Sequence, residues 1–146
     1  MSTQWIVGID GSPDGCMALN WAVMMAEESG GVVNPVTAWH VPLPLLVGTR
    51  HRMVDVDRIG LAAEASVMAT TTVDAADAPA GIIAEPSMVE GHPAPVLLAQ
   101  TGTDAVVVVG RRGVSDLKHR LLGSVSQYVA THGGVNEADP HRLIVM

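Results

Sequence analysis

The run Ala105–Val109, which reads AVVVV, constrains the fold more than any other segment of this chain. Every residue in it is apolar, so neither face of the strand that it forms can lie in water. A strand that is covered on both faces is typical of a parallel sheet with helices on either side. Glycine follows at once, and residues 110–124 then read GRRGVSDLKHRLLGS. We therefore ask what kind of group such a loop is built to meet.

Other apolar runs alternate with segments of helical character along the whole chain. Ser12 is a suitable N-cap, Pro13 suits the first helical position, and Gly30 can end that helix. The alternation predicts an α/β fold in a single domain, residues 1–146, with an open five-stranded parallel sheet and helices on both faces, as in Rossmann-like proteins. For this sheet we assume the strand order 3-2-1-4-5. Strands are predicted at 5–9, 32–41, 82–89, 105–109 and 143–146, and helices at 13–29, 54–73, 95–100 and 124–132.

The apolar spacing within the helices predicts which side chains face the sheet. In the first helix these are Trp21, Met24 and Met25; in the second, apolar residues recur at Val54, Ile59, Ala63, Val67 and Thr70. Pro35 lies inside the second predicted strand, which predicts that the first half of this strand is irregular or lies at a sheet edge.

The charge of the chain limits its partners. The formal net charge is −7, which disfavours nucleic acid and anionic membranes as partners. Half of the eight basic residues nevertheless lie between positions 111 and 120. A local positive field on an acidic chain indicates a small anionic ligand.

Cysteine content and the ends of the chain bear on its location. Cys16 is the single cysteine, so no intrachain disulfide forms. The start of the chain has no basic leader with a cleavage site, and no stretch approaches the roughly 20 apolar residues of a membrane span. A soluble cytoplasmic protein is expected.

The predicted strand order brings two chemically distinctive turns together. In the order 3-2-1-4-5 the first and fourth strands are neighbours, and ligands of such sheets bind beyond the carboxyl ends of the strands. Asp10 and Gly110 would then face one pocket. Gly110 and Gly113 would let backbone N–H groups approach an anion, since neither carries a Cβ. Gly123 and Ser124 open the last predicted helix, whose N-terminus favours phosphate.

Each of these residues also has a simpler interpretation. The glycines can serve as turn residues, and Ser124 can act as an ordinary helix cap. Arg111 and Arg112 are candidate phosphate ligands, but adjacent side chains diverge, so that at most one of the two reaches a ligand. Asp10 can accept a hydrogen bond from the exocyclic amine of adenine, or it can bond its own turn. The P-loop and G-x-G-x-x-G motifs are absent, which disfavours a dinucleotide.

The spacing Gly110-x2-Gly113-x9-Gly123-Ser124 resembles the nucleotide-binding signature of the universal stress protein family. The resemblance covers essentially the whole chain, through the segments VGIDGS, AWHVP, GHPAPVLL, DAVVVVGRRG and LLGSVSQYV in that order. It implies an α/β fold, homodimers and, in members that keep the signature, ATP binding. The final strand usually pairs across the dimer, but residues 133–142 depart from the family pattern with a longer polar connection.

The resemblance also implies roles for individual residues. Asp10 would meet the adenine, and the backbone of Val41 would contact the edge of the base. Gly8 and Ser12 would lie close to the same crevice. The ribose and phosphates would be held by Gly110, Gly113, Gly123, Ser124 and Val125.

No catalytic constellation is evident. The histidines, at positions 40, 51, 92, 119, 132 and 141, form no H-x-x-x-H pattern, so we expect no metal site, and His40 is interpreted as a core or crevice residue. Asp116 could bind a phosphate-bound Mg²⁺ through water. The sequence favours an ATP-binding stress-response or regulatory protein with at most slow hydrolysis. The alternatives are a slow ATPase or phosphotransferase, and a nucleotide-free structural dimer.

Overall fold

A computed structural model describes residues 2–41, 57–102, 104–111 and 142–145, the last of these by their backbone. The sheet has the order β3-β2-β1-β4-β5, and every neighbouring pair of strands is parallel. In chain order the elements are β1 (Gln4–Gly8), α1 (Pro13–Ser29), β2 (Val32–Trp39), α3 (Arg58–Ala75), β3 (Ser87–Glu90), α4 (Pro93–Ala99), β4 (Ala105–Val109) and β5 (Arg142–Val145). The predicted helix at 124–132 lies outside the described residues.

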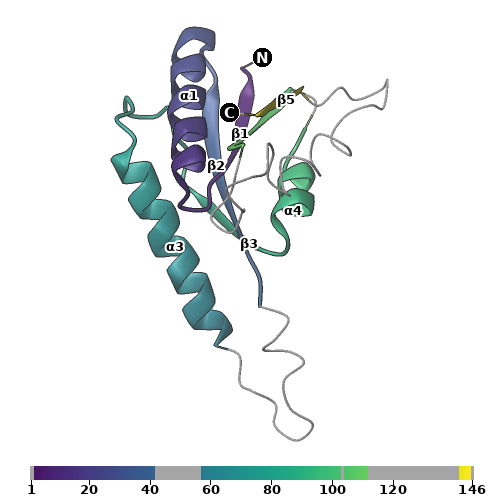
Figure 1. Ribbon diagram of the computed structural model, residues 1–146. Coiled ribbons are helices and arrows are strands. Elements are labelled where there is room, and N and C mark those ends of the chain that lie inside the picture. The colour runs from purple at the N-terminus through teal and green to yellow at the C-terminus, as the bar shows by residue number, and fades with distance from the viewer. Residues whose placement is uncertain (1, 42–56, 103, 112–141, 146) are drawn as a thin grey trace, which may run out of the picture.

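Helices cover both faces of the sheet, as predicted (Figure 1). Helices α1 and α3 pack on one face over Val7, Val33 and Val108, and α4 packs on the other over Ile6 and Val107. All five residues of β4 are buried, which confirms the interpretation of the AVVVV run. None of the helices among the described residues is long and apolar enough to cross a membrane.

Local capping sets the ends of α1 where the sequence predicts them. The Ser12 hydroxyl accepts a hydrogen bond from the Gly15 N–H at 3.1 Å, and Pro13 occupies the first helical position. Gly30 ends the helix in the left-handed conformation, with φ of 73°, and its N–H donates to the carbonyl of Ala26. These capping interactions involve only residues within about one turn of the helix ends, so they do not depend on what the helix packs against.

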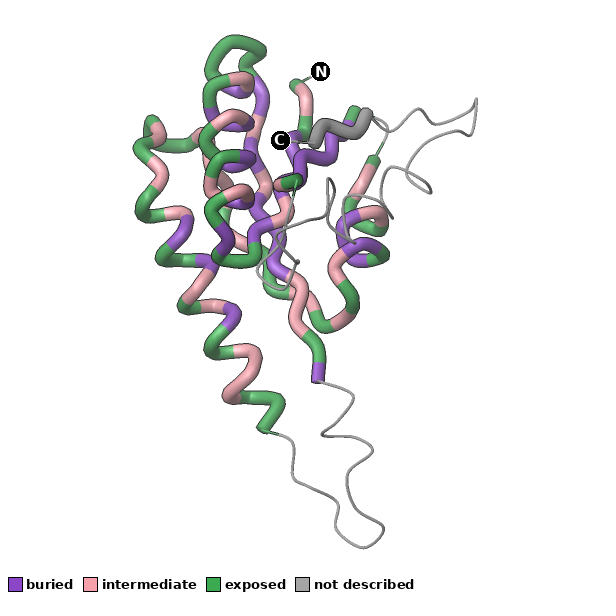
Figure 2. The backbone as a smooth tube through the Cα atoms, viewed as in Figure 1, coloured by how far each residue is buried: buried purple, intermediate pink, exposed green. Residues whose placement is uncertain are grey.

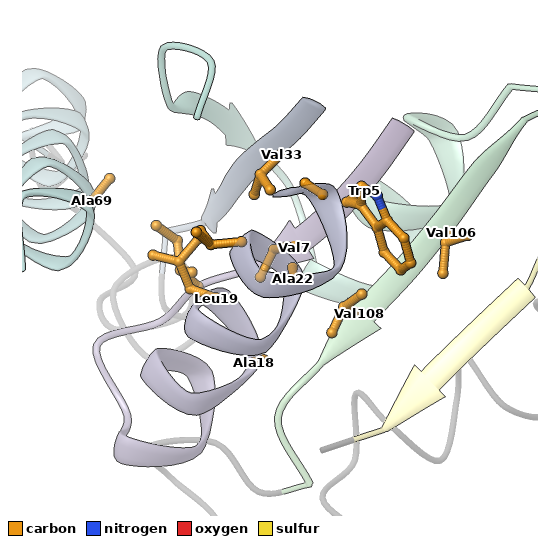
Figure 3. Close-up of a cluster of buried hydrophobic side chains, with 12 residues drawn as sticks. Trp5, Val7, Ala18, Leu19, Ala22, Val33, Ala69, Val106 and Val108 are labelled. Carbon is orange, nitrogen blue, oxygen red and sulfur yellow. The ribbon is translucent and has the colours of Figure 1, made fainter. Parts of the chain in front are cut away.

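The buried faces of α1 and α3 differ from the prediction. In α1 the sheet side consists of small and aliphatic residues such as Ala18, Leu19 and Ala22, seen in Figure 3, whereas Met24 is 48% exposed. Trp21 and Met25 are partly buried against this cluster, so two of the three predicted contacts are confirmed. The small residues let the helix axis approach the β-branched sheet closely.

In α3 the described residues that the apolar spacing predicts to face the sheet are exposed, and other, smaller residues are buried instead. Its buried residues are Ala65, Ala69 and Thr72, while Ile59 and Val67 are 84% and 66% exposed. The helix begins at Arg58 after the N-cap Asp57, four positions later than predicted, and its first turns have little buried surface (Figure 2). A stripe of small residues suits close packing against β2, and apolar spacing alone does not reveal it.

Pro35 lies within β2, a strand with neighbours on both sides, and not in an irregular or edge segment. The Val33 carbonyl accepts a hydrogen bond from the Ala84 N–H, on the side of β2 that faces β3. Because backbone groups two residues apart in a strand point the same way, those of residue 35 face the same side. There the ladder is interrupted, between an isolated bridge at Ile83 and the first residue of β3, Ser87. The donor that proline lacks is therefore not needed at this position.

Candidate functional site at the carboxyl edge of the sheet

The carboxyl ends of β1 and β4 lie side by side, so the turns that leave them meet at one edge. Val7 pairs with Val108 in the parallel register, one residue before each of these strands ends. Strand β1 leads into α1 on one face of the sheet. The switch in strand order at β1 and β4 is where ligands bind in folds of this kind.

Asp10 is exposed at the end of β1 and bonds its own turn. Its Oδ1 accepts a hydrogen bond from the Ser12 N–H at 2.9 Å. The preceding residue, Ile9, is buried and anchored to β2, because its N–H donates to the Val36 carbonyl and its carbonyl accepts from the Thr37 hydroxyl. The turn role of Asp10 is thus confirmed, and its predicted contact with a base stays a prediction.

Ser12 is buried and caps α1, so its hydroxyl already has a structural partner. Gly15, in the first turn of α1, lies directly over this arrangement. A Cβ at position 15 would lie 3.1 Å from Asp10 Oδ1 and 3.2 Å from Ser12 Oγ. Glycine lowers helix stability in general, but at position 15 it leaves room for the two oxygens that order the turn.

Gly110 brings the end of β4 against the start of α1. A Cβ at this position would lie 2.7 Å from the carbonyl carbon of Asp14, 2.8 Å from its Cβ and 2.9 Å from the Gly15 nitrogen. Sequence reasoning explained Gly110 by the approach of an anion. The structure supplies a second reason, since no side chain fits between this residue and the helix.

Three further predicted residues lie at or near this edge. Gly8 ends β1 and faces α4, where an added Cβ would lie 2.9 Å from Leu97 Cδ1, so its place near the crevice also serves packing. Val41 is buried just beyond β2, and Arg111 is exposed just beyond β4. The other predicted ligands, together with Asp116, lie outside the described residues: Arg112, Gly113, Gly123, Ser124 and Val125.

Charges of both signs lie at this edge. Asp10 follows β1, Asp14 in the first turn of α1 adjoins Gly110, and Arg111 begins the basic segment that follows β4. A carboxylate accepts hydrogen bonds and repels phosphate, while guanidinium groups and backbone N–H groups attract it. The edge could thus hold the amine of a base on the β1 side and an anion on the β4 side.

A hollow of about 690 Å³ among the described residues lies elsewhere. Gln4, Asn34 and Ala105 line it, all at the amino ends of their strands. Asn34 Nδ2 donates to Gln4 Oε1 at 2.8 Å across its rim. It therefore lies at the opposite end of the sheet from Asp10 and Gly110, and we assign the site to the carboxyl edge.

The fold is a doubly wound α/β sheet, and the two turns lie at its switch point, where ligands bind in folds of this kind. A family model described as the universal stress protein family matches residues 1–135. The chain therefore belongs to the universal stress protein family, and it is a stress-response protein of that family. A search of curated proteins found no significant match.

Solved structures of this family share the fold over almost the full length. The universal stress protein UspA from Lactobacillus plantarum is similar with a TM-score of 0.68 at 19% identity, covering 99% of this chain and 97% of that one. A universal stress protein in complex with cAMP is similar with a TM-score of 0.61 at 25% identity, covering 99% and 96%. A universal stress protein from Archaeoglobus fulgidus has a TM-score of 0.54 at 18% identity, covering 99% and 93%.

Proposed function

We propose that this chain is a regulatory protein that binds an adenine nucleotide at the carboxyl edge between β1 and β4, with ATP as the favoured ligand. The observation that carries the proposal is the meeting of two turns at that edge: the Asp10 turn, ordered by its own hydrogen bonds, and Gly110, held against the start of α1. The base would lie on the Asp10 side, and the phosphates would follow the glycine-rich segment after β4.

Two further observations support an adenine nucleotide. The sequence keeps the spacing Gly110-x2-Gly113-x9-Gly123-Ser124, which would offer backbone N–H groups and a helix N-terminus to an anion. A structurally similar universal stress protein was solved in complex with cAMP. The glycine-rich segment is long enough to follow several phosphates, and for this reason we favour ATP over cAMP.

Thermal unfolding with added nucleotide tests this function. Because ATP would bind the native state only, a concentration of about 100 times the dissociation constant adds roughly 2.7 kcal/mol to stability and raises the melting temperature. Gly113→Val should abolish the rise, since a branched side chain fills the approach to the phosphates. Gly102→Val is the matched control, because no atom lies within 4 Å of a Cβ built at Gly102.

Parallel titrations with cAMP, ADP and GTP identify the preferred nucleotide. A protein whose melting temperature responds to none of these nucleotides is the nucleotide-free structural dimer instead. An ATP response that Gly113→Val leaves unchanged removes the glycine-rich segment from the site. Steady Mg²⁺-dependent phosphate release that Asp116→Ala abolishes favours the ATPase alternative.

We further propose that the chain acts in the cytoplasm as a homodimer joined through its final strand. The net charge of −7 and the single cysteine favour a reducing, aqueous compartment without nucleic-acid partners. Strand β5 ends the sheet order, and an open sheet edge favours pairing with a second copy.

A further inference from the structure

Two histidines far apart in the sequence meet at the carboxyl edge of the sheet, beyond β2 and β3. His40 follows β2, and His92 precedes α4. Their ring centroids are 4.7 Å apart and their planes are inclined by 39°. Both residues are exposed, so His40 is not the core residue that its position in an apolar run suggests.

The backbone holds both residues in place. Trp39 and Glu90 form the last pair between β2 and β3, and the Gly91 N–H then donates to the Trp39 carbonyl at 2.8 Å. Gly91 has φ of 149°, a conformation that side chains disfavour, and a Cβ there would lie 2.9 Å from Val96 Cγ2. This glycine turns the chain so that the next residue, His92, comes to lie over His40.

The start of α4 fixes His92 without using its ring. His92 is the N-cap residue, and its carbonyl accepts the first helical hydrogen bond from the Val96 N–H at 3.1 Å. Its side chain makes no capping hydrogen bond. The imidazole is therefore held at a defined distance from its partner and stays available to a ligand.

We propose that His40 and His92 together bind one divalent transition-metal ion, with the remaining coordination positions open to water or an exchangeable ligand. With the metal about 2.1 Å from each ligating nitrogen, two imidazoles on one ion have centroids about 4.5 Å apart at a right-angled coordination and about 5.2 Å apart at a tetrahedral one. The observed 4.7 Å lies between these two values, so the ring spacing suits one ion shared by both imidazoles, and copper(II) is the divalent ion that such ligands bind most strongly.

Among the described residues, this site has two candidate protein ligands. Glu90, the nearest acidic residue in sequence to His92, forms an ion pair with Arg58 at the start of α3. Among the residues that the structure describes, no group of three His, Cys, Asp or Glu side chains is arranged to hold a metal. Such a site exchanges its metal, unlike the closed sites that stabilise small domains. The proposal does not depend on nucleotide binding.

Titration of the full chain with copper(II) chloride alone, at pH 7.5 in a non-coordinating buffer, tests the site. Quenching of tryptophan fluorescence reports binding, because Trp39 adjoins His40. Electron paramagnetic resonance of the first equivalent should show two imidazole nitrogens. The affinity order should be copper above nickel above zinc. Acidification should release the metal, since the ligating nitrogens must be unprotonated.

The variants are His40→Gln, His92→Asn and the double substitution. Asparagine is a good N-cap, so His92→Asn removes the imidazole without weakening the start of α4. Each single variant should weaken the first copper equivalent at least about tenfold, and the loss in the double variant should be smaller than the sum of the two single losses, because losing either ring already breaks the chelate. Melting curves without metal should coincide for all four proteins.

Two results would overturn the proposal. One is an unchanged affinity for the first equivalent in either single variant, which assigns that copper to other histidines or to the N-terminus. The other is a double variant whose loss equals the sum of the two single losses, which shows that the two rings do not share one ion.

Discussion

The turn at residues 10–12 uses two side-chain oxygens to satisfy backbone N–H groups that have no strand or helix partner. Asp10 Oδ1 accepts from Ser12, and Ser12 Oγ accepts from Gly15. This arrangement complicates a simple test of base recognition, because truncating Asp10 also removes a turn bond. Asparagine keeps a side-chain oxygen for that bond and adds an N–H donor, so it separates the two roles.

Asp10→Asn should narrow the preference for ATP over GTP. A carboxylate accepts from the exocyclic amine of adenine but opposes the carbonyl of guanine, and a buried polar mismatch costs roughly 1–3 kcal/mol, about tenfold to a hundredfold in affinity. Asp10→Ala should weaken ATP binding, and it should narrow the ratio of ATP to GTP affinity less than Asp10→Asn does. Calorimetric titration of each variant with both nucleotides measures this ratio. Asp14→Asn is the control, because it also replaces an acid of this edge with an amide. An unchanged ratio in Asp10→Asn means that Asp10 orders the turn only.

Gly110→Ala should destabilise the fold even without ligand. The new methyl group would meet the backbone of Asp14 and Gly15 at 2.7–2.9 Å, where no flexible side chain can give way. Overpacking of this kind costs typically about 1–3 kcal/mol. Gly102→Ala, in open space, should stay within about 0.5 kcal/mol of the unmodified protein. Urea unfolding measures both, and equal midpoints for the two variants would show that α1 can shift to accommodate the methyl group.

At the scale of elements, α3 presents its larger apolar side chains to solvent and its small ones to the core. Ala69 is fully buried against the cluster around Leu19, whereas Val67 is 66% exposed. The packing of α3 is therefore stabilised by the close approach of its backbone to the core, and not by the burial of large side chains.

The same substitution at two positions in α3 tests this arrangement. Ala69→Asn should destabilise the protein by about 2 kcal/mol or more, because it buries an amide without partners and overfills the contact. Val67→Asn should change stability by no more than about 0.5 kcal/mol. Thermal or urea unfolding of the pair decides the matter. A larger loss at Val67 would mean that the outward face of α3 is covered in solution.

At the scale of the molecule, β3 and β5 end the sheet order, and among the described residues no strand pairs with the outer side of either. Both strands have four residues, but their compositions differ. Strand β3 reads SMVE, with polar residues at both ends, whereas the final strand contains the apolar run LIV, which favours pairing with another chain.

We therefore predict a homodimer through β5. Light scattering at tens of micromolar, about the range in which an interface of standard size holds, should give about twice the monomer mass of 15.2 kDa. Proline scanning of Leu143 and Ile144 provides the control, because one of the two N–H groups faces β4 and the other faces outward. Proline at the position whose N–H faces outward leaves the hydrogen bonds to β4 intact, so that variant should fold and be monomeric. A monomer mass for the unmodified protein would remove β5 as an interface.

Much of the fold follows from local chemistry, and sequence alone therefore predicts it. The caps Ser12, Pro13 and Gly30 act within one turn of the chain, and the uniform apolarity of β4 admits only a strand covered on both faces. The alternation of strands and helices then implies parallel pairing, while the neighbouring of β1 and β4 followed from an assumed strand order that the structure has. These features predicted the edge at which the Asp10 turn and Gly110 meet.

Only the tertiary structure decided which faces and neighbours these elements use. Small residues in α1 and α3 carry little apolar signal, so the contacts of Ala18 and Ala69 are invisible to hydrophobic spacing. The approach of α1 to Gly110 and the meeting of His40 with His92 join residues far apart in sequence. Such contacts depend on strand register and helix direction together, and no local pattern records either of them.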